Sequence, residues 1–321
     1  KESKMKTVLA EPLTISKETL QAFEEALGQG ENEFFSYDTK PASVEEWEKR
    51  MEGAEQLIIA NTKLPEEAVR KAKALKYINV AFTGVDHVPM DVCKELGIEV
   101  SNAAGYSDEG VAEEVIGLAI ALLRHMKAAD QGIRQGGRAA EFLGAEIAGR
   151  TVGIIGTGKI GTRVAQLFKA MGANLIGYNR SEHQEVIQLG LEYKSLEEVM
   201  KESDIITVHL PQNDHTRDFL TKKEFDLMKP TAILINCARG PIVNSKDLAE
   251  ALKAGKLAGA GVDVFNQEPP LSEEPLLEAP NTILMPHVAY FTQEAMEKRA
   301  KIVLENAVDY LEGRPVKTRM I

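Results

Sequence analysis

Three side chains suited to acid–base and carboxylate chemistry occur in the C-terminal half of the chain: Arg239 in NCARG, Glu268 in FNQEPP and His287 in MPHVAYFT. An arginine can bind a carboxylate through two parallel hydrogen bonds, and a histidine can give or take a proton near neutral pH. A nearby glutamate would orient the imidazole. Together they suit hydride transfer to or from the carbonyl carbon of a 2-oxo acid, with Arg239 on the carboxylate and His287 protonating the carbonyl oxygen during reduction. Singly, each is also typical of a surface ion pair, a loop histidine or a solvated turn.

The position of polar and special residues along the chain favours the functional interpretation. Six short apolar runs alternate with helical patterns after residue 150, and each run ends in such a residue. Parallel strands end at one edge of a sheet, and α/β proteins bind ligands at that edge. We therefore expect one shared site there. Its strand-end residues are Gly156, Asn179, His209 followed by Leu210 and Pro211, Cys237 followed by Ala238 and Arg239, Asp263, and His287.

A glycine-rich turn, GTGKIG, lies between the first of these strands and a helical pattern. In that context GxGxxG predicts a dinucleotide site, because Gly156 permits a tight turn, Gly158 lets the backbone approach the pyrophosphate, and Gly161 lets helix and strand pack closely. The unpaired N–H groups where the helix begins, near Lys159 and Ile160, would then attract the phosphates.

The residues after the next strand bear on which nicotinamide cofactor is used. A carboxylate is common there and binds a ribose 2′-hydroxyl, but this chain has Asn179, Arg180 and Ser181. An amide does not repel a 2′-phosphate, and Arg180 and Ser181 could bind one. The pattern favours NADP(H) over NAD(H). The alternative is that Arg180 points to solvent or stacks on adenine, with Glu182 as the acceptor for NAD.

The elements that position these residues indicate two doubly wound α/β domains, each with a parallel sheet. Four strand patterns precede residue 101, and six follow residue 150, which is enough for a Rossmann domain. An apolar segment over residues 108–136 is expected to be one long buried helix between the domains, and the amphipathic tail should return to the first domain. We expect residues 1–101 plus 289–321 to form a smaller, flavodoxin-like substrate domain and residues 102–288 to form the NAD(P)-binding domain.

Composition narrows the class further. The chain has 321 residues, 44% of them apolar, and a formal charge of −11 without basic runs, which disfavours nucleic acid and anionic membrane partners. Its two cysteines cannot form a disulfide framework or a CxxC metal motif, so no metal is expected. No membrane span or signal peptide pattern is evident, and a cytoplasmic location is expected. Met5 is a candidate natural start, after an extension Lys1–Lys4.

Over essentially its full length the chain resembles the D-isomer-specific 2-hydroxyacid dehydrogenase family. The aromatic residues after His287 resemble D-lactate-type enzymes, whereas the other motifs look closer to the glyoxylate/hydroxypyruvate reductase type. The Trp that family members often carry before the glycine-rich turn is absent. The motifs that carry the resemblance are FTGVDHV (82–88), NAAGYSDEGVAEEVIGLAIALLR (102–124), GIIGTGKIG (153–161), HLPQNDHTRDFL (209–220), LINCARGPIVN (234–244), GAGVDVFNQEPP (259–270) and MPHVAYFT (285–292).

The resemblance implies an NAD(P)H-dependent oxidoreductase acting on glyoxylate, hydroxypyruvate or pyruvate, usually as a homodimer. It implies a catalytic trio of Arg239, Glu268 and His287. Two alternatives remain open: an enzyme like D-3-phosphoglycerate dehydrogenase, and a non-enzymatic, dinucleotide-sensing corepressor or scaffold. The further residues it assigns are Asp263 for the nicotinamide carboxamide, Phe82, Thr83 and Gly84 for the substrate carboxylate, Val111 and Thr216 for the cofactor, and Tyr290 for the substrate pocket or for simple packing.

Overall fold

The computed structural model describes residues 4–321, which divide into two compact units. The first unit comprises everything described before Asp108 together with Phe291–Ile321, and the second comprises Asp108–Tyr290. The chain passes from one unit to the other after Ser107 and again after Tyr290, a few residues later than the domain borders expected at 101 and 288. The extension expected before Met5 falls mostly outside the described residues. Within residues 4–321, no helix has the length and apolarity that crossing a membrane would require.

The first unit is built on a five-stranded parallel sheet with the order β2-β1-β3-β4-β5, the flavodoxin-like order. Four of its strands were expected. The fifth, β2, is an edge strand whose side chains are partly or fully exposed, so it lacks an apolar run. The strands are β1 (Lys6–Leu9), β2 (Glu33–Ser36), β3 (Gln56–Ile59), β4 (Tyr77–Val80) and β5 (Glu99–Ser101), and the helices before α12 are α1 (Lys17–Leu27), α2 (Val44–Met51), α3 (Glu66–Lys71) and α4 (Met90–Leu96).

Helix α12 (Gln293–Leu311) is the amphipathic tail, and it packs on the first sheet as the sequence predicted. Thr292 begins it, since its hydroxyl accepts a hydrogen bond from Ala295 N at 3.1 Å. The Asn79 amide on β4 donates to Val303 O of the helix at 2.8 Å. This buried polar contact fixes how the helix lies on the sheet, because an unpaired amide there would be costly.

The second unit is built on a seven-stranded parallel sheet with the order β12-β11-β10-β9-β6-β7-β8. This is the Rossmann order, which reverses between β6 and β9, and one short strand, β8, adds to the six expected. The two parallel sheets, one in each unit, confirm the predicted α/β class. The strands are β6 (Thr151–Ile155), β7 (Asn174–Tyr178), β8 (Glu192–Tyr193), β9 (Ile205–Val208), β10 (Ile233–Asn236), β11 (Gly259–Val262) and β12 (Thr282–Leu284).

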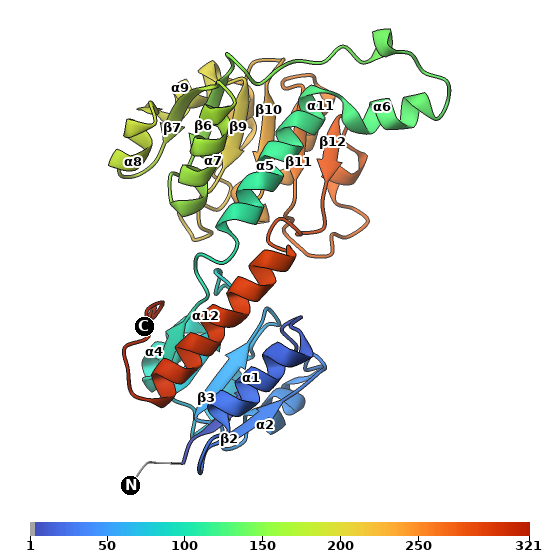
Figure 1. The fold of residues 1–321 in the computed structure, drawn as a ribbon. Coiled ribbons are helices and arrows are strands. Elements are labelled where there is room, and N and C mark those ends of the chain that lie inside the picture. Colours follow the sequence, from blue (N-terminus) through green and yellow to red (C-terminus); the bar gives the residue numbers. More distant parts are fainter. Residues whose placement is uncertain (1–3) are drawn as a thin grey trace. The chain divides into compact units, whose positions relative to one another are not determined.

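The apolar segment expected as one long helix is two helices, α5 (Asp108–Leu123) and α6 (Met126–Ile133). The prediction of a single helix was wrong because His125 has φ 49°, a left-handed conformation that ends α5. Helix α5 belongs to the second unit and covers β10 and β11 beside α7 (Lys159–Ala170; Figure 1). The other short helices of this unit are α7 (Lys159–Ala170), α8 (Gln184–Gln188), α9 (Leu196–Glu202), α10 (Lys222–Phe225), α11 (Ser245–Lys253), η1 (Ala139–Glu141), η2 (Gly240–Ile242) and η3 (Pro275–Glu278).

Candidate active site

Two positions of the glycine-rich turn between β6 and α7 can accommodate only glycine, because a side chain there would clash with the backbone. Gly156 has φ 96°, and a Cβ there would lie 2.6 Å from His209 O. A Cβ on Gly161 would lie 2.0 Å from Gly156 O, so the helix could not approach the turn. Gly158 begins α7 without a side-chain cap, and its Cβ direction meets nothing within 4 Å. A helix that begins without a side-chain cap, at a glycine with room beside it, fits the pyrophosphate of a dinucleotide.

The loop after β7 contains the residues expected to read the adenosine ribose. The Asn179 amide nitrogen donates to Ser181 O at 2.7 Å, while Arg180 and Ser181 are exposed. The sequence did not identify Tyr193 on β8, whose hydroxyl lies 2.6 Å from Thr157 Oγ1 and accepts from His183 N at 3.1 Å. Tyr193 therefore ties the glycine-rich turn to this loop.

The expected cofactor residues after β9 form a self-contained loop. His209 Nε2 lies 2.8 Å from Thr207 Oγ1, and burial lowers the pKa of His209 to about 3, so the ring is neutral. Thr216 closes the loop, because its hydroxyl donates to Pro211 O at 2.7 Å and accepts from Asn213 N at 2.9 Å. Thr216 thus shapes the backbone of this loop.

His287 and Glu268 are in direct contact. His287 Nδ1 lies 2.6 Å from Glu268 Oε2, and Phe265 N donates to Glu268 Oε1 at 3.0 Å. Burial alone would raise the pKa of Glu268, but the hydrogen bonds from His287 and Phe265 and the charges of His287 and Arg239 outweigh it and lower that pKa. Because Glu268 is ionised at neutral pH, Nδ1 carries the hydrogen, and Nε2 is the nitrogen left to exchange a proton.

Asp263, at the end of β11, holds the backbone that carries His287. His287 has φ 55°, a conformation costing about 1–3 kcal/mol for a residue of this kind, which neighbouring structure must impose. His287 N donates to Asp263 O at 2.8 Å. The Asp263 carboxylate accepts from Val288 N at 2.8 Å and from Ala289 N at 3.0 Å. The strained residue is therefore held on both sides by Asp263.

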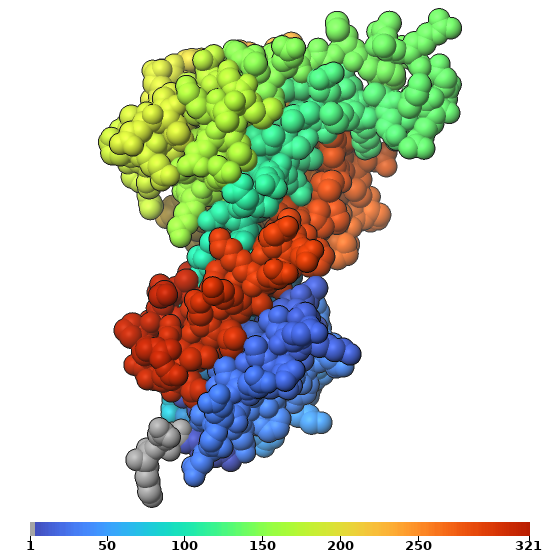
Figure 2. All heavy atoms as spheres, in the orientation of Figure 1, coloured from blue at the N-terminus to red at the C-terminus, as the bar shows by residue number. Residues whose placement is uncertain are grey.

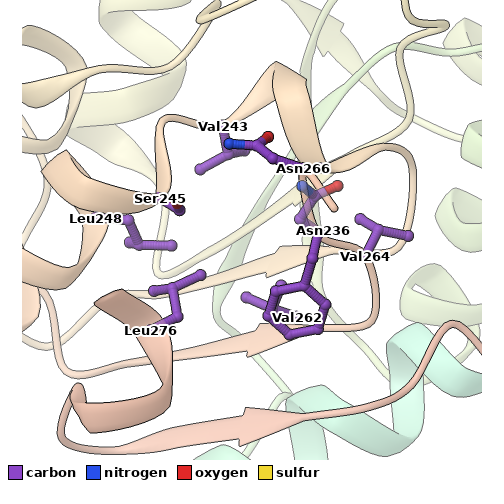
Figure 3. A pocket seen from close by; sticks show the side chains of 10 residues that line it. Asn236, Val243, Ser245, Leu248, Val262, Val264, Asn266 and Leu276 are labelled. Atoms are coloured by element: carbon purple, nitrogen blue, oxygen red, sulfur yellow. The ribbon is translucent and has the colours of Figure 1, made fainter. Parts of the chain in front are cut away.

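Arg239 lies near Glu268 because the loop after β10 packs closely on the loop after β11. Gly240 has no room for a side chain, since a Cβ would lie 2.2 Å from the Phe265 carbonyl carbon. Arg239 Nη1 donates to Ala238 O at 2.7 Å, which holds the side chain along its own loop. Figure 3 shows the gap behind these loops, lined by residues that include Asn236 and Asn266. At about 10 Å³ it has room for roughly one water, so it is a packing gap and not a ligand site.

The remaining predicted residues are divided between the two units. Tyr290 places its ring edge-on to the His287 ring, with centroids 5.6 Å apart. In the first unit, Phe82, Thr83 and Gly84 follow β4, and the Asn102 amide donates to Thr83 O at 2.9 Å. Within the described residues, the N–H groups of Thr83 and Gly84 donate to no protein acceptor, so they are available to a ligand.

Other expected residues lie near these loops. Val111 is buried in the first turn of α5. Cys237 is also buried, and burial, with the negative charges of Asp263 and Glu114 adding, raises the pKa of its thiol. Among residues 4–321 no group of His, Cys, Asp and Glu side chains could hold a metal ion.

Comparison with known proteins gives consistent matches. Residues 116–289 match the model for the D-isomer specific 2-hydroxyacid dehydrogenase, NAD binding domain. The chain is 34% identical to a D-3-phosphoglycerate dehydrogenase of Archaeoglobus fulgidus over 98% of its own length, but spans only 58% of that relative. It is 37% identical to a glyoxylate reductase of Aeropyrum pernix over 77% of each chain. An acyclic imino acid reductase solved in complex with NADPH and D-Arg superposes with a TM-score of 0.89 at 31% identity, covering 99% of this chain and 100% of that one.

Proposed function

Because this chain belongs to the D-isomer specific 2-hydroxyacid dehydrogenase family, we propose that it is an NAD(P)H-dependent reductase of small 2-oxo acids of the glyoxylate, hydroxypyruvate or pyruvate class. The observation that carries the proposal is the 2.6 Å contact between His287 Nδ1 and Glu268 Oε2. It lies at the same sheet edge as a glycine-rich turn that fits a dinucleotide. An acid–base histidine beside a dinucleotide site is what reversible carbonyl reduction needs.

The bound nicotinamide would supply the hydride that reduces C2 of the acid. Arg239 binds the substrate carboxylate through its guanidinium fork and polarises the ketone. His287 gives the proton on Nε2 to the carbonyl oxygen as the alcohol forms. Ionised Glu268 stabilises the imidazolium and keeps the ring oriented. In the oxidation direction, His287 takes the hydroxyl proton back.

The first unit is proposed to bind the substrate and the second to bind the cofactor. The glycine-rich turn in the second unit supports this division, as does the loop after β4 in the first. The free cysteines Cys93 and Cys237 are both buried, which is compatible with a reducing compartment, and we place the protein in the cytoplasm.

The test is an assay of the purified protein with glyoxylate, hydroxypyruvate, pyruvate, a longer 2-oxo acid and 3-phosphohydroxypyruvate, each with NADPH and with NADH. Oxidation of the cofactor by one of the small acids supports the proposal, and the best acid gives the substrate class. A preference for the phosphorylated acid would instead favour a phosphoglycerate dehydrogenase. Tight cofactor binding without turnover of any acid would favour a dinucleotide-sensing corepressor or scaffold.

The proposed preference for NADP(H) can be reversed at Asn179. We expect Asn179→Asp to lower the NADPH-to-NADH ratio of kcat/KM by one to two orders of magnitude, because a carboxylate repels a 2′-phosphate and one charge-assisted contact contributes about 1.5–3 kcal/mol. Asn174→Asp, at the other end of β7, is the matched control and should leave the ratio unchanged. If Asn179→Asp also leaves it unchanged, this loop does not read the phosphate.

We further propose a homodimer formed through α6 and the segment after it. Figure 2 shows this segment, in green, standing out from the rest of the second unit. Helix α6 buries none of its residues, and three apolar side chains are exposed in or near it: Met126 (49%), Ile133 (66%) and Leu143 (89%). Isolated apolar side chains are ordinary on a surface, but an entire amphipathic helix without buried residues indicates a missing partner.

Sedimentation of the wild-type protein is expected to give a dimer, and Ile133→Glu combined with Leu143→Glu should give a monomer. The charges would be buried without partners in the interface. Gln131→Glu changes an exposed polar residue of the same helix and should leave the dimer intact. A wild-type monomer at micromolar concentration would contradict this assignment.

A further inference from the structure

Helix α5 and strand β11 run side by side in opposite directions. The two glycines of β11 show which residues of the helix and the strand lie opposite each other. A Cβ on Gly259 would lie 3.3 Å from Leu122, and a Cβ on Gly261 would lie 3.2 Å from Leu118. Four residues along a helix and two along a strand each advance about 6–7 Å. The next pair in this register is therefore Glu114 opposite Asp263.

Glu114 lies on the covered side of α5 with these leucines. The Oε1 atom of Glu114 is buried. If every carboxyl group is ionised, this oxygen has no hydrogen-bond donor among the described residues. The Asp263 carboxylate already accepts two backbone N–H groups. Asp263 is buried and Glu114 is partly buried, so two neighbouring carboxylates here are poorly screened by water and repel each other, and one proton removes that repulsion and creates a donor.

We propose that Glu114 and Asp263 share one proton, with the Glu114 carboxyl donating to Asp263, and that this pair sets the charge and the backbone position behind His287. The proposal rests on the proposed function only for its consequence on catalysis. Glu114 acts through Asp263, so it is a positioning residue and not a catalytic one. Asp263 is the accepting partner because the N–H groups of Val288 and Ala289 favour its ionised form.

The electrostatic surroundings agree with this assignment. Burial, together with the charge of Asp263 and the hydrogen bond to it, raises the pKa of Glu114 to about 7, and His287 opposes the shift. Burial also raises the pKa of Asp263, although the N–H groups of Ala289 and Val288 counteract it. The other titratable groups facing the pair are Cys237 and Glu268.

The pair makes the charge behind His287 depend on pH. It carries one negative charge below the pKa of Glu114 and two above it. A second negative charge behind His287 favours the protonated ring that reduction of the carbonyl requires. Glu114→Gln can still donate a hydrogen bond to Asp263 but cannot ionise, so it keeps the position of Asp263 and loses the extra charge.

Infrared difference spectroscopy of the purified protein tests the shared proton without requiring turnover. At pH 6 we expect the carbonyl stretch of a protonated carboxylic acid in wild type and in Glu113→Gln, an exposed neighbour on the same helix. The band should disappear as the pH passes about 7 and should be absent from Glu114→Gln. In Asp263→Asn the band should disappear at a lower pH, because the repelling charge is gone.

The pH profile of kcat/KM for reduction tests the consequence. Its alkaline limb should move to lower pH by about one unit in Glu114→Gln and not in Glu113→Gln. An identical band in wild type and Glu114→Gln overturns the proposal, and so does an identical profile with unchanged thermal stability. Should Glu114→Gln fail to fold, the shift of the band in Asp263→Asn decides the matter. If no 2-oxo acid is reduced, the proposed function fails while the infrared result still decides on the pair.

Discussion

Replacing His287 with alanine is expected to lower kcat by about 10²–10⁴-fold, because the carbonyl oxygen then receives its proton from water. Binding of the nicotinamide cofactor should be nearly unchanged, since the glycine-rich turn and the loops after β7 and β9 do not depend on the imidazole. The measurements are steady-state kinetics with the best 2-oxo acid and a fluorescence titration with NADPH. A kcat within tenfold of wild type would remove His287 from the chemistry.

Glu268→Gln provides a graded comparison for this prediction. Its amide oxygen can still accept from His287 Nδ1, the contact now 2.6 Å long, but the negative charge that stabilises the imidazolium is lost. We expect a smaller loss, about 10–10²-fold in kcat. Because Glu268 acts through His287, the double variant should lose no more activity than His287→Ala alone. A further loss in the double variant would mean that Glu268 has a separate role.

Local sequence patterns were sufficient for much of the fold and for the position of the candidate site. The buried strands are short apolar runs, and the residues after them are recognisable without knowing how the chain packs. The two missed strands, β2 and β8, lie at sheet edges, where exposed side chains leave no apolar run. The break at His125 was also invisible, because a left-handed residue between two helical patterns leaves no glycine or proline to mark it.

The contacts that the sequence did not reveal depend on how distant elements pack. The pairing of Glu114 with Asp263 depends on the register of α5 on β11, which the sequence does not show. Glu114 comes four and eight residues before Leu118 and Leu122, and this helical spacing was a signal that it lies on the same face of α5 as the two leucines. Tyr193 binds Thr157 from a two-residue strand that no pattern predicted. Asp263 was expected to contact the nicotinamide, but its two oxygens also hold the backbone after His287, which only the tertiary structure specifies.

Arg239→Met is expected to lower kcat/KM for the 2-oxo acid by about 10²–10⁴-fold, because two charge-assisted hydrogen bonds of about 1.5–3 kcal/mol each are lost. The loss should appear in KM as well as in kcat, since the guanidinium holds the carboxylate before hydride transfer and polarises the ketone during it. Steady-state kinetics resolve the two constants. Arg314→Met removes an exposed arginine paired with Asp309 and should change neither.

Arg239→Lys separates the charge of the side chain from its geometry. A lysine keeps the positive charge beside Glu268 but cannot present two parallel N–H groups to a carboxylate, so most of the loss should remain. Guanidinium ion added to Arg239→Ala should restore part of the activity and should do nothing for His287→Ala, because only the first variant leaves a space of that shape and charge. Near-wild-type kinetics in Arg239→Lys would mean that a point charge suffices and that the two parallel hydrogen bonds of the guanidinium are not needed.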